Sequence, residues 1–301
     1  KFKWYETPDG RSTTFFQPQT DDSDWVEMPV PGIWELNGSG DPLYVNIGYC
    51  WKGQFENNPP YVPVEKNHVG QYRNSFTVPA DWNGKQIILH IGSATSNIRV
   101  WINGKEVGYS QDSKLEARFD LTKYVKAGEN LIALEIFRWC DGSYLEDQDF
   151  WRLSGIFRDV YLVSERKDAP HDLIVETQLS DDLRSGRFVV RDENGNVLKE
   201  RDVPDVKLWS CEYPYVYMTP IDHRWGLWIS GGTDYRAVTF GFRKIEIRDA
   251  VLYLNGKRLL VQLPNPPQIE PTTGSAVTLD GTKPHNALTK AFHVNAPRPR
   301  H

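Results

Sequence analysis

The sequence predicts an all-β protein of two consecutive sandwiches, because short runs rich in aromatic and β-branched residues alternate with turn residues, as in antiparallel sheets. Residues 98–102 and 105–109 flank Asn103-Gly104, a dipeptide that favours a tight hairpin turn. Aromatic residues make up 13% of the chain, and each of them buries a large area in a core. Further strands are expected at residues 71–78, 86–91, 117–120 and 130–139. These runs place the first sandwich in residues 1–166.

A polar linker that ends in Pro170 separates this region from a second set of short strand-like runs, which begins at residues 172–176. Asn194-Gly195 lies between the apolar residues 188–190 and residues 197–199, and it predicts a second hairpin. The second sandwich is therefore expected in residues 170–247.

Composition and charge narrow the class of protein. The 301 residues carry a formal net charge of −5, which argues against nucleic acid or an anionic membrane as the main partner. No apolar run reaches the length of a membrane span, and the first residues lack the apolar core of a signal peptide. Cys50, Cys140 and Cys211 are widely spaced and odd in number, so neither a disulfide framework nor a zinc site is expected. We expect a soluble cytoplasmic protein, and a periplasmic one with free thiols fits equally.

The segment at residues 138–160 combines acids, arginines and tryptophans between two strand-like runs, where a solvated loop usually carries Gly, Ser and Pro. Its acids can accept hydrogen bonds from sugar hydroxyls or coordinate a hard cation through oxygen. The alternative is a buried ionic corner in which arginines neutralise the acids and the tryptophans join the core. The residues concerned are Glu146, Asp147, Asp149, Arg138, Arg152, Arg158, Trp139 and Trp151.

The run 141–160, which begins Asp141-Gly142-Ser143-Tyr144-Leu145-Glu146-Asp147-Gln148-Asp149, closely resembles the N-terminal sugar-binding domain of family 2 glycoside hydrolases, specifically the large bacterial β-galactosidases. Other pieces of the family pattern follow in the right order. They are residues 28–38, 41–47 and 58–63 upstream, and Leu208-Trp209-Ser210, Gly241-Phe242-Arg243 and Leu254-Asn255-Gly256-Lys257 downstream. The resemblance covers nearly all of residues 1–262.

The resemblance implies a galactose-binding-like jelly roll in residues 1–166, an immunoglobulin-like sandwich in residues 170–247 and only the start of a catalytic (β/α)8 barrel in residues 248–301. The immunoglobulin-like span is short, since a complete sandwich of this kind needs about 100 residues. Either strands are missing or residues 179–183 mark a deletion.

The resemblance also implies the residues that contact the sugar. Asp149 aligns with an aspartate that binds galactose hydroxyls and helps to ligate a monovalent cation, here Na⁺, and Asn46 aligns with an asparagine that hydrogen-bonds the substrate. His301 echoes a histidine that contacts sugar from a barrel strand. Tyr44 and Trp151 could stack on a sugar face, although core packing is the expected role of both. Glu146, Asp147 and Arg158 are expected to form a supporting ion-pair network.

The tail departs from the family pattern. Pro267 falls where the family carries a substrate-binding histidine, and of that motif only Asn265 remains. Prolines recur from Pro264 to Pro299, so loop or disorder is expected over residues 263–301. Retaining glycosidases need two carboxylic acids about 5 Å apart, and in this family both are glutamates of later barrel strands, one of them directly after an asparagine. No Asn-Glu dipeptide occurs here, so we expect no catalytic residue in this chain.

The leading hypothesis is the N-terminal portion of a retaining β-galactosidase that hydrolyses terminal β-D-galactosides such as lactose in carbohydrate metabolism. Such an enzyme is implied to be a homotetramer with Mg²⁺ and Na⁺, and most Mg²⁺ ligands belong to the barrel. The alternatives are a non-catalytic carbohydrate-binding module and a structural module. Residues 254–262, which lead into a barrel in the family, favour the first hypothesis.

Overall fold

The computed structural model describes residues 1–301 except 46–47, 147–149, 222–226, 230–232, 264–268 and 297–301. Antiparallel strands dominate it, so the predicted all-β class is confirmed. The chain divides between Val163 and Ser164 into two compact units, with residues 269–285 of the tail joining unit 1. The predicted sandwich boundary at residue 166 lies close to this division.

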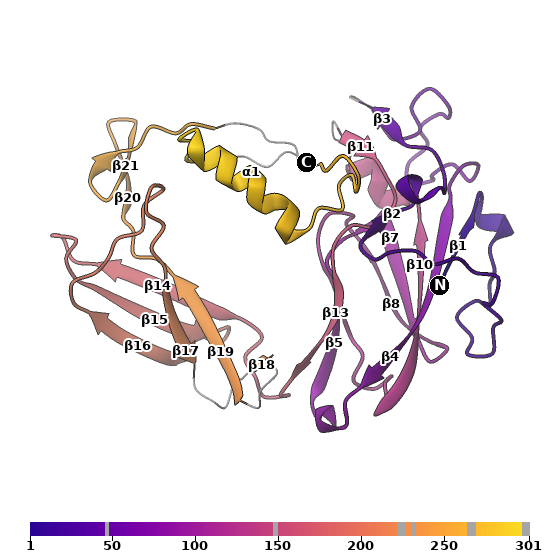
Figure 1. Ribbon diagram of the computed structural model, residues 1–301, viewed down its shortest axis with the longest axis horizontal. Coiled ribbons are helices and arrows are strands. Elements are labelled where there is room, and N and C mark those ends of the chain that lie inside the picture. The colour runs from indigo at the N-terminus through magenta and orange to yellow at the C-terminus, as the bar shows by residue number, and fades with distance from the viewer. Residues whose placement is uncertain (46–47, 147–149, 222–226, 230–232, 264–268, 297–301) are drawn as a thin grey trace. The chain divides into compact units, whose positions relative to one another are not determined.

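Unit 1 is a sandwich of antiparallel sheets (Figure 1). Its largest sheet has the order β1-β4-β10-β7-β8, formed by Phe2–Tyr5 (β1), Val69–Val78 (β4), Gly128–Phe137 (β10), Asn97–Ile102 (β7) and Lys105–Gln111 (β8). A second sheet consists of Val160–Glu165 (β13), Gln86–Ile91 (β5) and Ala117–Asp120 (β9). A third consists of Gly32–Ile33 (β2), Gly155–Ile156 (β12) and Ala94–Thr95 (β6).

The predicted hairpin between β7 and β8 is confirmed. Ile102 pairs with Lys105, and the two turn residues between them have positive φ, 51° at Asn103 and 82° at Gly104. These angles fit a two-residue primed turn, whose twist matches that of the flanking strands. The Asn-Gly dipeptide thus sets the register of the sheet edge.

Trp34 is fully buried in the core of unit 1. Its indole Nε1 donates a hydrogen bond to the hydroxyl of Tyr72 at 2.5 Å, so its polar atom is satisfied within the core. The ring lies against Gly70 of β4, where a Cβ would come within 2.2 Å of Trp34 Cζ2 and 2.9 Å of Phe2. Only a residue without a side chain leaves room for this indole.

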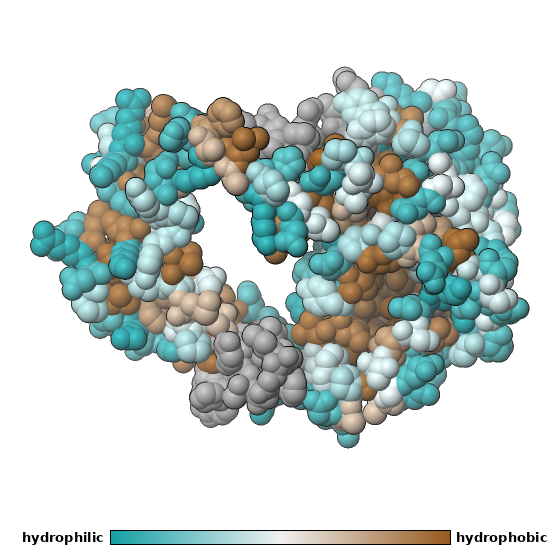
Figure 2. Space-filling model, viewed as in Figure 1, coloured by the Kyte–Doolittle hydropathy of each residue, from teal (hydrophilic) through white to brown (hydrophobic). Residues whose placement is uncertain are grey.

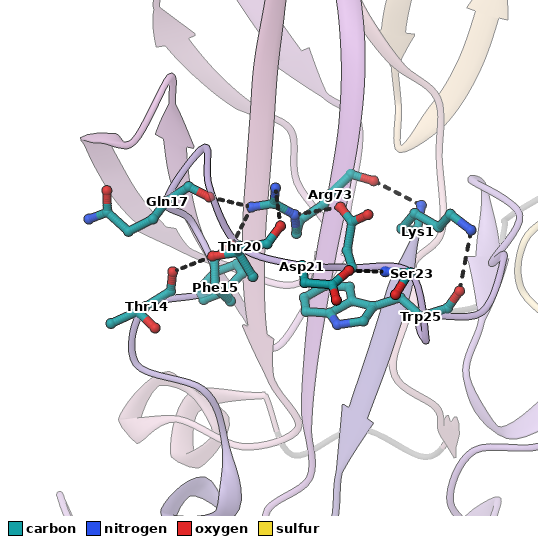
Figure 3. A network of polar contacts seen from close by, with 10 residues as sticks. Lys1, Thr14, Phe15, Gln17, Thr20, Asp21, Ser23, Trp25 and Arg73 are labelled. Atoms are coloured by element: carbon teal, nitrogen blue, oxygen red, sulfur yellow. Dashed lines mark hydrogen bonds and ion pairs between the residues drawn. The ribbon is translucent and has the colours of Figure 1, made fainter.

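A buried arginine fastens the loop of residues 12–25 to the outer face of the largest sheet (Figure 3). Arg73 of β4 donates to Asp22 Oδ2 at 2.7 Å and to the carbonyl oxygens of Phe15, Gln17 and Thr20. Phe15, Trp25 and Trp101 then pack together as a separate apolar cluster under the loop. The guanidinium supplies the hydrogen bonds that an irregular loop cannot obtain from a strand partner.

Among its described residues, unit 2 contains three three-stranded sheets, of which two have the orders β14-β15-β16 and β17-β19-β18. Their strands are Leu173–Leu179 (β14), Gly186–Asp192 (β15), Val197–Val203 (β16), Tyr217–Ile221 (β17), Thr233–Phe240 (β19) and Leu227–Ile229 (β18). Phe188, Val190, Ile221 and Phe242 form the buried core of this unit. The hairpin predicted around Asn194-Gly195 is confirmed as the connection of β15 and β16.

The tail begins with a small sheet of Ile245–Arg248 (β20), Val251–Leu254 (β21) and Lys257–Arg258 (β22), in which Asn255-Gly256 forms the second turn. The expectation of loop or disorder over the whole of residues 263–301 is wrong, because Leu279–Ala291 form helix α1. Of the prolines in the tail, Pro284 alone falls within these residues, and Asp280 and Lys290 complement the helix dipole at either end. The helix buries none of its residues.

Replacing Gly70 by Ala is expected to lower the free energy of unfolding by about 3 kcal/mol, because the new methyl group overlaps the ring of Trp34, which is fully buried in the core. Urea unfolding followed by tryptophan fluorescence measures the change. Gly10→Ala is the control, since the nearest atom to its Cβ is 3.9 Å away. Equal stability of the two variants would show that the core yields around Trp34.

Candidate functional site

Two short strands meet at one end of unit 1, in the region where the sequence predicts sugar contacts (Figure 1). Leu43–Val45 (β3) pair antiparallel with Phe150–Arg152 (β11), so that Val45 faces Phe150 and Tyr44 faces Trp151. Val45 directly precedes Asn46 in the sequence, and Phe150 directly follows Asp149. We call the β3–β11 pair the rim.

The predicted site residues Asn46, Asp149 and His301 lie outside the described residues, as does Asp147. Their roles in sugar and Na⁺ binding therefore stay predictions. The structure does describe residues that lie close to Asn46 and Asp149 in the sequence.

The side chains of Tyr44 and Trp151 are exposed on the rim. They are 47% and 41% accessible, and their ring centroids lie 5.4 Å apart at an interplanar angle of 52°. The expectation that both pack in the core is wrong, because both rings are accessible and belong to a two-stranded sheet that is separate from the larger sheets of unit 1. Large exposed aromatic rings next to polar groups are suited to cover the apolar C–H face of a sugar.

Arg152 holds the two segments of the rim together. Its buried guanidinium donates from Nη1 to the carbonyl oxygen of Glu146 at 2.9 Å and from Nη2 to that of Gly48 at 3.4 Å. The carboxylate of Glu146 in turn accepts hydrogen bonds from Ser113, 3.1 Å from the backbone nitrogen and 2.5 Å from the hydroxyl. Ser113 is fully buried, so this chain of contacts leads from the rim into the sandwich.

The expected ion-pair network is wrong for Glu146 and Arg158. Glu146 bonds to Ser113, while Arg158 donates to the carbonyl oxygens of Phe157 at 3.0 Å and Ser275 at 2.7 Å. A guanidinium can satisfy several backbone acceptors at once, and the irregular segments of this region expose such acceptors. The sequence analysis did not identify Gly48 and Ser113 as contacts of Arg152 and Glu146, because a glycine or a serine by itself does not indicate such a contact.

A second buried arginine supports the chain just before β3. Arg138 donates to the carbonyl oxygen of Asp41 at 3.3 Å, lies within 3.4 Å of His68 Nδ1 and covers the ring of Trp139 at 5.1 Å. Burial, followed by the nearby charge of Arg138, lowers the pKa of His68 to about 4. His68 is therefore neutral at pH 7, and its Nδ1 can accept a hydrogen bond from Arg138.

Behind the rim lies a cavity of about 30 Å³, lined by Cys50, Ser143, Glu146 and Arg152 among others. A cavity of this size holds about one water molecule and is too small to enclose a sugar ring. Burial raises the pKa of Cys50 to about 12, which keeps this thiol protonated and rules it out as a nucleophile at neutral pH.

A larger hollow of about 560 Å³ opens elsewhere on unit 1, and Figure 2 shows apolar residues gathered in a hollow of this unit. Its walls include Met28, Leu134, Ile156 and Val160. The same walls include Lys1, Glu27, Arg73 and Asn74, so charged and polar residues line this hollow together with the apolar ones.

Within the described parts of the chain, no three His, Cys, Asp or Glu side chains gather into a group that could hold a metal ion. No helix in those parts is long and apolar enough to cross a membrane.

The fold is shared with solved glycosidase structures. A β-glycosidase from Bacteroides vulgatus is similar with a TM-score of 0.74 and 21% sequence identity, over all of this chain and 40% of that protein. A β-glucuronidase from Bacteroides uniformis is similar with a TM-score of 0.75 and 20% identity, over all of this chain and 38% of its own. These similarities define a β-sandwich protein whose fold is shared with part of each of these two solved structures.

Residues 1–166 match the sequence model described as "Glycosyl hydrolases family 2, sugar binding domain". The chain is 32% identical to a β-galactosidase of Priestia megaterium and 35% identical to one of Photobacterium profundum, each match spanning the whole of this chain. It covers 33% and 32% of these relatives, so it spans about a third of their length. The chain belongs to glycosyl hydrolase family 2.

Replacing His68 by Gln is expected to reduce the acid sensitivity of the fold. Because the pKa of His68 is lowered from its ordinary 6.5 to about 4, its contribution to stability is full above pH 6.5 and is lost as the pH falls towards 4. The lost stability amounts to at most about 3 kcal/mol. The Gln variant does not show this loss, because Gln cannot be protonated. Urea unfolding at pH 7.5 and 4.5 measures the free energy of unfolding of each protein.

The exposed His171 supplies the control for this experiment, as His171→Gln. This variant should lose as much stability between the two pH values as the unaltered protein. An equal acid response of all three proteins would contradict a buried neutral His68.

Proposed function

We propose that this chain is the sugar-binding part of a β-galactosidase and binds a terminal galactose residue on the rim. The pairing of β3 with β11 carries the proposal, because it joins Val45 to Phe150, the sequence neighbours of Asn46 and Asp149. The β-galactosidases of Priestia megaterium and Photobacterium profundum support this choice of sugar.

The chemistry of the proposed site divides between polar and apolar contacts. The carboxylate of Asp149 and the amide of Asn46 are acceptors for the ring hydroxyls, and the amide donates as well. The exposed rings of Tyr44 and Trp151 cover the apolar face of the sugar. Sodium at Asp149 belongs to the same proposal, as do Mg²⁺ and the tetramer of the assembled enzyme.

We further propose that bond cleavage is not performed by residues 1–301. Retention of configuration requires an acid and a nucleophilic carboxylate about 5 Å apart. Near the rim, the carboxylate of Glu146 accepts hydrogen bonds from Ser113, which suits a supporting role. Under this proposal the chain binds lactose-like β-D-galactosides and depends on other residues of the enzyme for hydrolysis.

A non-catalytic carbohydrate-binding module is the second candidate, and the exposure of Tyr44 and Trp151 favours it, because such modules hold sugars on exposed rings. The two candidates differ in whether the bound sugar lies in an active site. A carbohydrate-binding module holds the sugar and takes no part in its hydrolysis.

Calorimetric titration of the 301-residue chain with galactose in buffer containing Na⁺ is expected to show weak binding. Asp149→Ala should lower the affinity about tenfold or more, since a hydrogen bond to a charged acceptor contributes about 1.5–3 kcal/mol. Asp81→Ala, at an exposed position in the 3-10 turn Ala80–Trp82, is the control and should bind like the unaltered chain. Glucuronic acid serves as the competing sugar, and tighter binding of it than of galactose would contradict the proposed substrate.

The same preparation is expected to leave a chromogenic β-galactoside intact, because the required pair of carboxylic acids is proposed to be absent. Release of the chromophore is followed by absorbance over hours, with a complete bacterial β-galactosidase as the positive control. Hydrolysis by the chain alone would contradict the assignment and direct attention to Glu146 and Asp149.

A further inference from the structure

The hollow of about 560 Å³ in unit 1 opens between strands that face each other across the sandwich. One wall is the inner face of β4 and β10, where Leu134 pairs with Tyr72 and Ile132 pairs with Asn74. The opposite wall comes from β12 and β13, through Ile156 and Val160. Small-molecule sites commonly have volumes of about 300–1,000 Å³, so this hollow is large enough for a ligand.

The floor of the hollow belongs to the apolar core of unit 1. Leu134 and Ile156 are buried members of the main core cluster, and Met28, Ile132 and Val160 pack against it while remaining partly accessible. Protein interiors are otherwise close-packed. An apolar body that fills the hollow would remove these side chains from water and supply the packing contacts that they lack.

The mouth of the hollow is polar. Asn74 occupies an inner-face position of β4, between Tyr72 and Phe76, which both contribute to the core, and it is nevertheless exposed. Glu27 lines the same hollow and is exposed as well. Within the part of the chain that the structure describes, neither side chain makes a hydrogen bond. The mouth therefore offers an amide and a carboxylate to a ligand.

The charges around the hollow balance one another. Arg73 turns its guanidinium to the outer face of β4, where it donates to Asp22 Oδ2 at 2.7 Å. The side chains of Lys1 and Glu27 are both exposed and carry opposite charges. An ion that entered the apolar hollow would lose its hydration without a net attraction to replace it. The lining therefore favours a neutral ligand.

We propose that this hollow binds a neutral amphiphile, whose aliphatic chain lies on the apolar floor and whose hydroxyl head hydrogen-bonds to Asn74 and Glu27 at the mouth. A hydroxyl group suits both partners, because it donates to a carboxylate and accepts from an amide N–H. The hollow shares no residue with the rim, so this binding site goes beyond the proposed function.

The test uses the 301-residue chain and N-phenyl-1-naphthylamine, a neutral fluorophore that brightens in apolar surroundings. We expect the fluorophore to bind and 1-octanol to displace it. Asn74→Ala should weaken the displacement by 1-octanol about two- to tenfold, since one neutral hydrogen bond is lost. Ser75→Ala is the matched control: Ser75 is the exposed neighbour on the outer face of β4, and this variant should stay within about twofold.

A second pair of variants changes the space in the hollow. Ile132→Trp places a larger ring opposite Asn74 and should weaken the binding of 1-octanol about tenfold or more, because the ring takes the place of the chain. Ile132→Val leaves the hollow open and should bind 1-octanol within about threefold of the unaltered chain. Thermal unfolding shows whether each variant is folded.

Each result decides for or against the site. Absence of displacement by 1-octanol from the unaltered chain would overturn it, and so would equal affinities of Asn74→Ala and Ser75→Ala. Unchanged binding by a folded Ile132→Trp variant would place the ligand elsewhere, and if this variant does not fold, the comparison of Asn74→Ala with Ser75→Ala decides. Tighter binding of sodium octanoate, which has an anionic head, would contradict a neutral ligand. Galactose is absent from these measurements, so this site and the proposed function fail or stand separately.

Discussion

The burial of Trp34 is the constraint on which the arrangement of unit 1 depends. Its ring occupies the space that Gly70 leaves open, and its backbone N–H donates to the carbonyl oxygen of Ser154 at 2.9 Å. The next residue, Glu35, accepts the N–H of Ser154 at 2.9 Å through its carboxylate. Ser154 follows β11 by two residues, so Trp34 and Glu35 hold the backbone just after the rim. A shift of the indole would therefore reach β11 through two hydrogen bonds.

Three buried arginines and the half-buried Arg158 of unit 1 donate hydrogen bonds to the backbone. Arg73, Arg138, Arg152 and Arg158 each donate to at least one carbonyl oxygen of an irregular segment. Loops have carbonyl groups without strand partners, and burying such groups unsatisfied costs about 1–3 kcal/mol each. Arginine meets this need because it offers five N–H donors on one planar group and stays charged when buried. The sandwich can thus carry long, fixed loops between short strands.

Sequence reasoning succeeded where the signal is local. Asn103-Gly104 and Asn194-Gly195 marked real hairpins: φ is positive at both residues of the first dipeptide and at Gly195 of the second, a conformation that these residue types favour. It failed for Trp151, which is exposed, since the same residue type fills cores and surfaces and only the end of the sheet decides between them. The ion-pair network expected of Glu146, Asp147 and Arg158 is wrong at Glu146 and Arg158 for a related reason. Charges close in sequence suggest pairing, whereas the fold offers these groups a serine and backbone carbonyls.

The small volume behind the rim bears on how the proposed site works. A cavity for about one water molecule cannot enclose a sugar, so the rim contacts only part of the ligand surface. Binding by such a shallow surface depends on a few contacts, and their relative placement then matters more than their number.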